Sequence, residues 1–403
     1  MKIVQYIKNK GIRRLFQVVY RYKIDIFYQK ILKILFNKKA LKNVIIIESH
    51  NDFDCNGGAF YNYLIEKKYN SKYKIVWLLK NSIQKELPQN VVTFNLYKPS
   101  IRKMYYTCIA KYFLADCVVT DKIRNDQKSF YLTHGPIGLK SVKGVSHLPE
   151  SVDYVCEPSE FFASIAADQL ELQYPNERFI YVGYPCHDLL YKESNKEIQK
   201  ISKRQFDKTI VWMPTFRKGG GFNRNDSKKV MKMGIPIIAD EKMYMELNQL
   251  LLSLNILLII KIHPMQDLSE LRIKGTSNIV VLNGNDMKQK KLDNYRLLRD
   301  TDALISDYSS IAYDYLHLNK PIAYDLSDVQ DYTRGLCVKN IDDFIAGPII
   351  NNYEELLLFI KKVGQNVDEY SSQRMILLRK LFQYTDGNSC KRLVKFMGLD
   401  NDK

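Results

Sequence analysis

Residues 43–51 read Asn-Val-Ile-Ile-Ile-Glu-Ser-His-Asn, and this stretch sets the expected fold class. The apolar run at residues 44–47 is typical of a buried strand, and the polar residues that follow are typical of a turn. Beyond this stretch, strand and helix patterns alternate along the chain. Such alternation predicts a doubly wound α/β fold.

The first half of the chain carries a full set of these patterns. Helices are expected at residues 58–68, 102–111 and 159–169. Further strands are expected at residues 75–79, 91–94, 116–120, 130–133, 154–156 and 180–183. Residues 191–208 are rich in Lys, Glu, Asn and Ser, which is typical of a connection between domains.

The second half repeats the theme, with a helix at residues 243–253 and strands at 209–213, 256–262, 279–282, 303–306 and 322–324. Two Rossmann-like domains that face one another enclose a ligand cleft between the carboxyl ends of their strands, which is the GT-B arrangement. The length of 403 residues fits two such domains. We therefore expect an N-terminal segment at residues 1–42, a first domain at 43–190 and a second domain at 209–390.

The positive charge of the chain is concentrated near its N-terminus. The formal net charge is +17, and residues 1–42 hold 12 Lys and Arg residues with Asp25 as the single acidic residue. Apolar residues interleave with the basic ones at helical spacing, which predicts one or two amphipathic basic helices. An interfacial membrane anchor is favoured, because each Lys or Arg near an anionic surface contributes about 1 kcal/mol. A core-packing helix pair with a solvated basic face is the structural alternative, and nucleic-acid binding is the weakest reading, for lack of a recognisable module.

The remaining composition excludes several classes of protein. With 46% hydrophobic and 26% charged residues, the chain is globular rather than disordered or fibrous. Its seven cysteines are scattered without CxxC pairs, as expected of reduced thiols in a cytoplasm. No apolar run approaches the roughly 20 residues that span a bilayer, and no signal-peptide pattern begins the chain. The sequence predicts a protein that is neither secreted nor transmembrane.

Polar residues follow several of the predicted strands, where an α/β fold holds its ligands. His134 follows one such strand, in a turn that contains Gly135. His263 ends another strand, and Lys261 lies two residues before it. Arg217, which follows a third strand, offers a bidentate contact to phosphate. Each histidine alone is more often structural than catalytic, and their shared position at strand ends favours a function.

The motif Asp307-Tyr-Ser-Ser310 follows a further strand and is expected to begin a helix that runs to about residue 318. Ser309 or Ser310 either caps this helix or, together with free backbone amides, binds a pyrophosphate. Asp314 lies one turn after Ser310 on the same helix face, which suits a ribose or polyol hydroxyl.

Together these positions resemble the CDP-glycerol glycerophosphotransferases of teichoic-acid and capsule synthesis. The resemblance covers the chain from about residue 44 to the C-terminal helices. Two positions depart from it, because the family commonly has Trp before the first histidine and Arg after the Gly-x-Pro element, where this chain has Thr133 and Cys186. The matching motifs are His134-Gly135, Gly183-Tyr-Pro185 with Asp188, Pro214-Thr-Phe-Arg217, Lys261-Ile-His-Pro264, Ile305-Ser-Asp-Tyr-Ser-Ser310 with Asp314, Lys320-Pro321, Tyr332, Arg334-Gly335 and Gly347-Pro348.

The resemblance implies a GT-B fold and a CDP-glycerol or related CDP-polyol donor. It also implies a cytoplasmic enzyme, peripheral on the inner face of the cell membrane, that acts on a polyprenyl-diphosphate-linked saccharide or polymer. It carries functional roles over to His134, Gly135, Pro214, Thr215, Lys261, His263, Ser309, Ser310 and Asp314, and we add Arg217 and Arg334 as candidate phosphate-binding residues.

In the expected reaction an acceptor hydroxyl attacks the β-phosphorus of the CDP-polyol and CMP leaves. His134 is the candidate general base, since imidazole titrates near neutral pH. His263, with Lys261 and the helix start at Ser309 and Ser310, is expected to hold the pyrophosphate, although the two histidines can exchange these roles. No clustered carboxylates or His/Cys spacing point to a metal, so neither a metal nor another cofactor is expected.

Three other functions compete with this one. A CDP-ribitol phosphotransferase uses the same chemistry, and a GT-B glycosyltransferase uses a nucleotide sugar instead. A non-enzymatic basic protein of membranes or nucleic acid explains residues 1–42 but not the polar residues at strand ends, and no nucleic-acid partner is expected. The motifs do not separate glycerol from ribitol donors or priming from polymerisation, and they leave the acceptor and the oligomeric state open.

Overall fold

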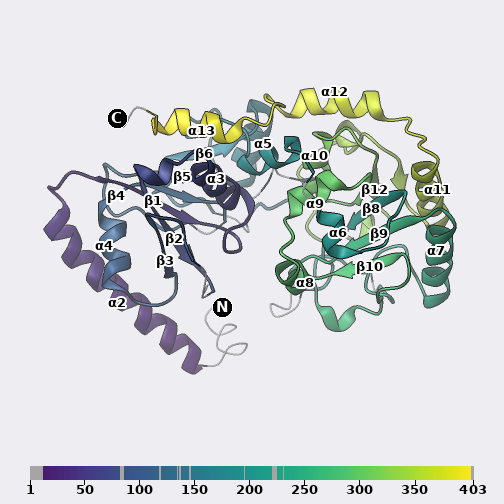
Figure 1. The fold of residues 1–403 in the computed structure, drawn as a ribbon, viewed down its shortest axis with the longest axis horizontal. Helices are drawn as coiled ribbons and strands as arrows, with labels where there is room; N and C mark the ends of the chain where they lie inside the picture. The colour runs from purple at the N-terminus through teal and green to yellow at the C-terminus, as the bar shows by residue number, and fades with distance from the viewer. Residues whose placement is uncertain are drawn as a thin grey trace.

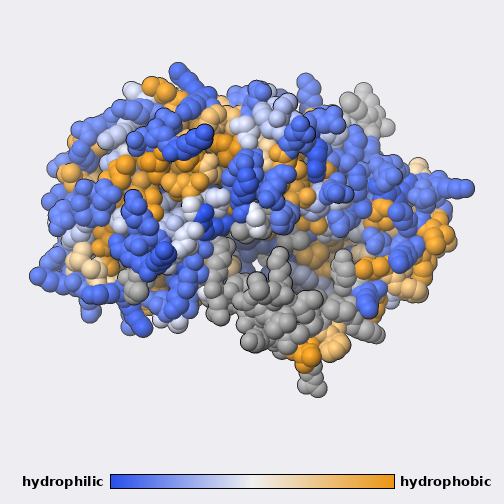
Figure 2. Space-filling view, turned by 180° about the vertical axis from the view of Figure 1, so that it is seen from behind, coloured by the Kyte–Doolittle hydropathy of each residue, from blue (hydrophilic) through white to orange (hydrophobic). Residues whose placement is uncertain are grey.

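The computed structural model describes residues 12–81, 86–117, 119–133, 135, 138–144, 147–194, 196–219, 225–229 and 231–400. Two α/β lobes stand side by side, and helices α12 (Ser371–Leu381) and α13 (Ser389–Met397) run along one edge of both (Figure 1). Seen from behind, the molecular surface is hollowed between the lobes (Figure 2).

The N-terminal lobe is built on one sheet with the strand order β3-β2-β1-β4-β5-β6-β7, in which neighbouring strands are parallel. The connection after β1 leads to β2 and the connection after β4 leads to β5, in opposite directions across the sheet, so a switch point lies between β1 and β4, where such folds bind ligands. The predicted first strand and its polar turn therefore lie at the centre of the lobe. The strands are β1 Lys42–Glu48, β2 Lys74–Leu79, β3 Val91–Asn95, β4 Ala110–Ala115, β5 Lys128–Tyr131, β6 Tyr154–Glu157 and β7 Phe179–Tyr181.

The position of β4 corrects the expectation of a helix at 102–111 followed by a strand at 116–120. Helix α4 (Ile101–Ile109) ends where β4 begins. Tyr112 and Leu114 enter the core cluster on one face of the sheet, whereas Phe113 enters the cluster on the other. This alternation is that of a strand buried on both faces, which the short apolar run at residues 112–115 did not reveal in the sequence.

The C-terminal lobe repeats the architecture with the order β10-β9-β8-β11-β12-β13, again with parallel neighbours. Its switch point lies between β8 and β11. The predicted strands at 279–282 and 303–306 match β10 and β11, and the short β13 is an addition that the sequence did not predict. The strands are β8 Lys208–Met213, β9 Ile256–Lys261, β10 Ile279–Leu282, β11 Ala303–Ser306, β12 Ile322–Asp325 and β13 Ile349–Ile350.

Helices cover both sheets, and the last one crosses back to the first lobe. Helix α13 follows the expected second domain at 209–390, but Leu393 and Val394 belong to the core of the N-terminal lobe. Asp188 holds this helix in place by accepting hydrogen bonds from the amides of Ser389 (2.8 Å) and Cys390 (2.9 Å). The other helices are α3 Cys55–Glu66, α5 Glu160–Gln169, η2 Pro185–Tyr191, α6 Glu197–Ile201, α7 Glu241–Ser253, α8 Gly284–Gln289, α9 Asn294–Asp300, α10 Ile311–Leu316 and α11 Tyr353–Gly364, with short turns η1 Tyr69–Ser71, η3 Leu268–Glu270, η4 Val329–Asp331 and η5 Asp342–Phe344.

An apolar core cluster joins the two lobes. Ala59 and Tyr184 of the N-terminal lobe belong to the same buried cluster as Leu304 and Leu316 of the C-terminal lobe. Burial of apolar surface stabilises such a junction in proportion to the area removed from water. The two sheets therefore have a defined relative position, which fixes where their switch points face each other.

A single helix, α2 (Ile12–Phe36), packs on α4 at the outer side of the N-terminal lobe (Figure 1). Asp25 pairs with the buried Lys103 at 2.6 Å, and Leu32 is buried beside Cys108. Residues 1–11 of the expected amphipathic segment lie outside the described residues. In the described part of the chain, no helix is long and apolar enough to cross a membrane.

Candidate active site at the carboxyl ends of the C-terminal strands

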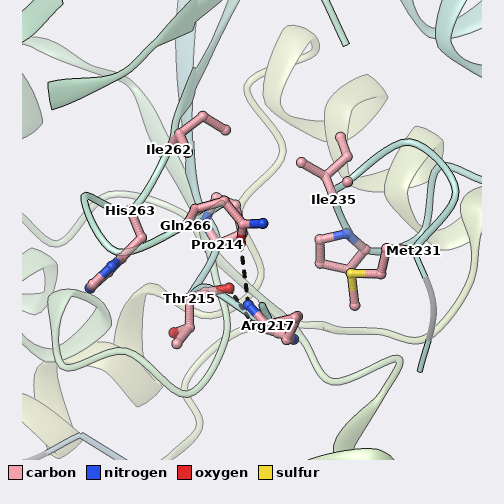
Figure 3. A pocket seen from close by; sticks show the side chains of 10 residues that line it. Pro214, Thr215, Arg217, Met231, Ile235, Ile262, His263 and Gln266 are labelled. Atoms are coloured by element: carbon pink, nitrogen blue, oxygen red, sulfur yellow. Dashed lines mark hydrogen bonds between the residues drawn. The ribbon is translucent and has the colours of Figure 1, made fainter. Parts of the chain in front are cut away.

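Most of the predicted site residues lie at one edge of the C-terminal sheet. Residues 214–217 follow β8, residues 262–264 follow β9 and residues 307–310 follow β11. Because β8 lies between β9 and β11, the three loops are neighbours at the switch point. A pocket there is lined by Pro214, Thr215, Ile235, Ile262, His263 and Gln266, among others (Figure 3).

Arg217 is buried and held by carboxylates, which corrects its expected bidentate contact to phosphate. Its guanidinium donates to Asp328 from Nε (2.7 Å) and Nη2 (2.9 Å), and to Asp307 from Nη1 (2.7 Å). The Thr215 hydroxyl also donates to Asp307, at 2.6 Å. These bonds hold the loop after β8 in shape. The sequence argument missed this network because Asp328 lies 111 residues from Arg217 and marks no motif.

His263 is half-buried beside the pocket and is oriented by its own turn. The backbone amide of Met265 donates a hydrogen bond to Nδ1 of His263 at 3.1 Å. A neutral imidazole that accepts at Nδ1 carries its proton on Nε2. The ring lies against Phe216, with 4.9 Å between centroids, and points away from Met231 and Ile235 (Figure 3). In this tautomer the N–H of His263 is at Nε2, which is the form of the ring that can donate to an anion.

Lys261 places a buried ammonium group at the end of β9. Burial lowers the pKa of Lys261 to about 8, and the charge of Asp54 from the N-terminal lobe opposes this shift. An ammonium group with little access to water is stabilised by a bound anion. Pyrophosphate binding by Lys261 stays a prediction, which we take up below.

A glycine of the other lobe, Gly138, contacts the predicted helix start at Ser309 and Ser310. His134, Pro136 and Ile137 lie outside the described residues, whereas Gly138 is described and buried. A Cβ atom at Gly138 would lie 2.6 Å from the amide nitrogen of Ser310 and 2.6 Å from the carbonyl oxygen of Tyr308. Only glycine allows two backbones to come this close. The segment that follows His134 is therefore docked on the turn that carries Ser309 and Ser310.

Backbone contacts extend this docking along the same segment. Cys337 donates from Sγ to the carbonyl oxygen of Gly138 (2.9 Å), and its amide donates to that of Leu139 (2.8 Å). The amide of Ser141 donates to the carbonyl oxygen of Gly335 (3.0 Å). The half-buried Arg334, which directly precedes Gly335, is thereby brought to the same junction. The segment after His134, the Ser309-Ser310 turn and the Arg334-Gly335 motif therefore meet at this junction.

The turn at Ser309 and Ser310 differs from the expected helix cap. Helix α10 is shorter than the expected 307–318, and Ser310 at its N-cap position is already helical and makes no side-chain cap bond. The Ser309 hydroxyl accepts from the amide of Ile311 at 3.5 Å, which is a weak bond. Capping therefore does not account for the two hydroxyl groups.

Asp314 is buried rather than open to a polyol hydroxyl. Its Oδ1 atom lies 2.6 Å from Nε2 of His187, and the hydroxyl of Tyr295 donates to Oδ2 at 3.2 Å. A Cβ atom at Gly135 would lie 3.7 Å from Oδ2 of Asp314 and 3.4 Å from Oγ of Ser310. The structure thus brings Gly135, Ser310 and Asp314 together and adds His187, which carried no signal in the sequence beyond its place after the Gly-x-Pro element.

Acidic side chains at the switch point of the N-terminal lobe were also absent from the sequence prediction. Asp116 accepts from the amides of His50 (2.6 Å) and Gly57 (2.9 Å). Burial raises the pKa of Asp116 well above its ordinary value, and burial raises that of Glu48 to about 7. The polar turn after the first strand was the available signal. Among the described residues, no three His, Cys, Asp or Glu side chains are grouped so as to hold a metal ion.

Two Rossmann-like lobes with matching strand orders, and a pocket at the switch point of the second, define a GT-B type of fold. The family model described as CDP-Glycerol:Poly(glycerophosphate) glycerophosphotransferase matches residues 28–398. The chain belongs to this family, and the predicted transfer of glycerol phosphate from CDP-glycerol agrees with that membership.

Relatives and solved structures agree with this assignment. The chain is 22% identical to the teichoic acid poly(glycerol phosphate) polymerase of Bacillus spizizenii, over 93% of this chain and 97% of that protein. It is 25% identical to the teichoic acid poly(ribitol-phosphate) polymerase of the same species, over 96% of this chain and 60% of that protein. The structure of the wall teichoic acid polymerase TagF superimposes with a TM-score of 0.72 at 19% identity, covering 99% of this chain and 98% of that one, and confirms the fold.

Proposed function

We propose that this chain transfers glycerol phosphate from CDP-glycerol to a hydroxyl group of a polyprenyl-diphosphate-linked saccharide or growing polymer, in teichoic-acid-like or capsule synthesis. Family membership supports the type of reaction. The observation that carries the proposal for the site is the docking of the segment after His134 on the Ser309-Ser310 turn. This turn follows β11 at the same edge of the sheet as the end of β9, which carries Lys261 and His263, with β8 between the two strands.

The acceptor oxygen attacks the β-phosphorus of CDP-glycerol, and a new phosphorus–oxygen bond forms. The bond from the β-phosphorus to the bridging oxygen breaks, and CMP leaves with that oxygen. His134 takes the proton of the attacking hydroxyl, while His263 donates its Nε2–H to the diphosphate. Lys261 supplies positive charge where negative charge grows on the leaving phosphate.

The test measures CMP release and product mass with CDP-glycerol and a lipid-linked acceptor, and measures donor binding separately by calorimetry. His134→Ala and His263→Ala are each expected to lower turnover by about 10²-fold or more. His147→Ala is the matched control, because the side chain of His147 is 67% exposed on the surface. Near wild-type turnover in either active-site variant would refute the role proposed for that histidine.

CDP-ribitol is the alternative donor, and the similarity to a poly(ribitol-phosphate) polymerase is the reason to test it. The same assay run with CDP-ribitol separates the two donors by their kcat/KM values. A preference for CDP-ribitol would replace glycerol phosphate by ribitol phosphate and leave the reaction unchanged. A UDP-sugar that serves as donor in place of both would overturn the proposal.

We further propose that helix α2 rests on the anionic inner surface of the cell membrane. Large apolar side chains on its outward side are exposed, and they include Phe16, Phe27, Ile31, Ile34 and Leu35. Hydrophobic patches follow this helix along the lower right edge of the molecule in Figure 2. Basic residues beside exposed apolar ones provide charge attraction and insertion at a lipid surface.

A further inference from the structure

A small cavity lies inside the N-terminal lobe and shares no lining residue with the pocket described above. Its polar side chains are Glu48 at the end of β1, Ser129 of β5, and Thr120 from the segment that follows β4. The cavity has a volume of about 10 Å³, and a cavity of about this size holds one water molecule. The other described residues of its wall are apolar, and they are Ile46, Phe113, Leu114, Ala115 and Val119.

The register of the sheet accounts for this cavity. Ala115 of β4 pairs with Glu48, and Phe113 of the same strand pairs with Ser129. Residues two apart in a strand point to the same face, so these four side chains share the face on which Phe113 and helix α4 form a core cluster. Because Ala115 carries only a methyl group, the side chains of the two neighbouring strands leave room above it.

Two polar atoms in the wall have no hydrogen-bond partner among the described residues. They are Oε1 of Glu48 and Oγ of Ser129, and each of the two residues is 1% exposed. Both residues are held in place, because Oε2 of Glu48 accepts from the Thr120 hydroxyl at 2.6 Å and the Ser129 amide donates to Asp153 at 2.8 Å. Buried polar atoms are nearly always hydrogen-bonded to protein or to ordered water, so these two atoms indicate a ligand.

A water molecule supplies what these two atoms need. It donates one hydrogen bond to Oε1 of Glu48 and shares a second with the Ser129 hydroxyl, and a buried water commonly makes two to four such bonds. An apolar occupant would leave both atoms unpaired, which costs free energy. A Ca²⁺ or Mg²⁺ ion takes about six oxygen ligands, whereas Glu48 is the one acidic side chain among the described residues of the wall.

We propose that this cavity is a binding site for one structural water molecule, which bridges Glu48 of β1 to Ser129 of β5 across β4. Through Glu48 and Thr120 the water also holds the segment after β4 against the end of β1. That segment begins with Asp116, which anchors the turn after β1. The water is therefore part of the frame of the N-terminal switch point, and this inference is independent of the proposed function.

A high-resolution crystal structure of the wild-type protein tests the site directly. We expect one ordered density peak at a distance of about 2.7–3.2 Å from both Oε1 of Glu48 and Oγ of Ser129. A wall with the same side-chain positions and no density between these two atoms would overturn the proposal. The same holds if the two atoms prove to be bonded to other protein groups.

The variant Ser129→Val tests the site in solution by the sign of a change in melting temperature. Valine removes the hydroxyl and fills the cavity, so it displaces the water and leaves Oε1 of Glu48 without a partner. We expect the Tm to fall by about 2 °C or more. A cavity without water predicts a higher Tm, because valine would then replace an unpaired hydroxyl by apolar contacts, and such a rise would refute the site.

A double-mutant cycle separates the loss of the water from crowding by the larger side chain. Glu48→Met removes the carboxyl group that the water serves and keeps a side chain of similar length. In the Glu48→Met protein, Ser129→Val is expected to lower the Tm by less than about half of the drop seen in the wild type, since no carboxyl oxygen is left unpaired. An equal drop in both backgrounds would show crowding alone and contradict the proposal.

Discussion

Lys261 ends a strand in which every residue is buried, so its ammonium group lies where water is scarce. Burial favours the neutral amine, whereas a bound diphosphate favours the ammonium form. Without a bound donor, burial lowers the pKa of Lys261 to about 8. The residue is thus protonated near neutral pH and loses its proton slightly above it.

We expect the affinity for CDP-glycerol to weaken as the pH rises through about 8. The donor binds the protonated form of Lys261, so above this pKa the Kd rises by up to about tenfold per pH unit. Lys261→Arg is expected to remove this dependence between pH 7 and 9, because arginine stays protonated. Calorimetric titration across this range is the measurement, and an equal slope for both proteins would show that another group titrates.

Glu48 provides a stability test at the same scale. Its Oε2 accepts from the Thr120 hydroxyl at 2.6 Å, and burial raises its pKa to about 7 from 4.5. Between these values the folded protein binds more protons than the unfolded one, so the Glu48 contribution to stability falls as the pH rises from 4.5 to 7. Glu48→Gln is expected to raise the free energy of unfolding by about 2 kcal/mol at pH 8 and by little at pH 5. Urea unfolding of both proteins at pH 8 and pH 5 measures this difference. An equal change in the free energy of unfolding at the two pH values would contradict the prediction.

At the scale of elements, helix α2 has a packed side and an exposed apolar side, which the sequence presented as alternatives. Its inner side packs on α4 through Leu32 and the pair of Asp25 with Lys103. Its outer side exposes Phe27 and Ile34 at 60% and 81%. Deletion of the helix would leave Lys103 buried without its partner, so substitutions on the outer side are the sharper test.

We expect Phe27→Ser combined with Ile34→Ser to weaken flotation with anionic vesicles, because insertion of apolar side chains supplies part of the binding. Leu358→Ser is the matched control, since Leu358 is 52% exposed on α11 of the other lobe. Flotation of the double variant at the wild-type level would remove α2 from the membrane contact. Loss of flotation in the control would point to general destabilisation.

At the scale of the whole molecule, the candidate site depends on the contact between the lobes. Gly138 of the first lobe touches the backbone of Ser310 in the second, and the shared core cluster holds this register. The catalytic arrangement is therefore a property of the two lobes together.

We expect Gly138→Ala to lower kcat by about tenfold or more, because a methyl group 2.6 Å from Ser310 N forces the docked segment away from its turn. Donor binding should change little, since Lys261 and His263 are untouched. Gly284→Ala is the matched control, because a Cβ there meets no atom within 4 Å. Steady-state kinetics and a separate measurement of donor binding test this prediction. An unchanged kcat in Gly138→Ala would contradict it.

The sequence by itself determined the α/β class, nearly all of the strands and the position of Lys261 and His263 at a strand end. These features depend on the local pattern of apolar and polar residues, because this pattern indicates which positions are buried. The same property explains the one displaced strand, since residues 110–115, which are apolar except for Lys111, fit a helix end as well as β4.

Only the tertiary structure decided which strand ends are neighbours and which polar groups are already occupied. Arg217 is held by Asp328, and Asp314 is held by His187, at separations of 111 and 127 residues. No local pattern encodes such partners, because the first pair is selected by packing within the C-terminal lobe and the second by packing across the junction of the two lobes. The sequence therefore located the candidate residues, and tertiary packing decided which of them are already paired with another side chain.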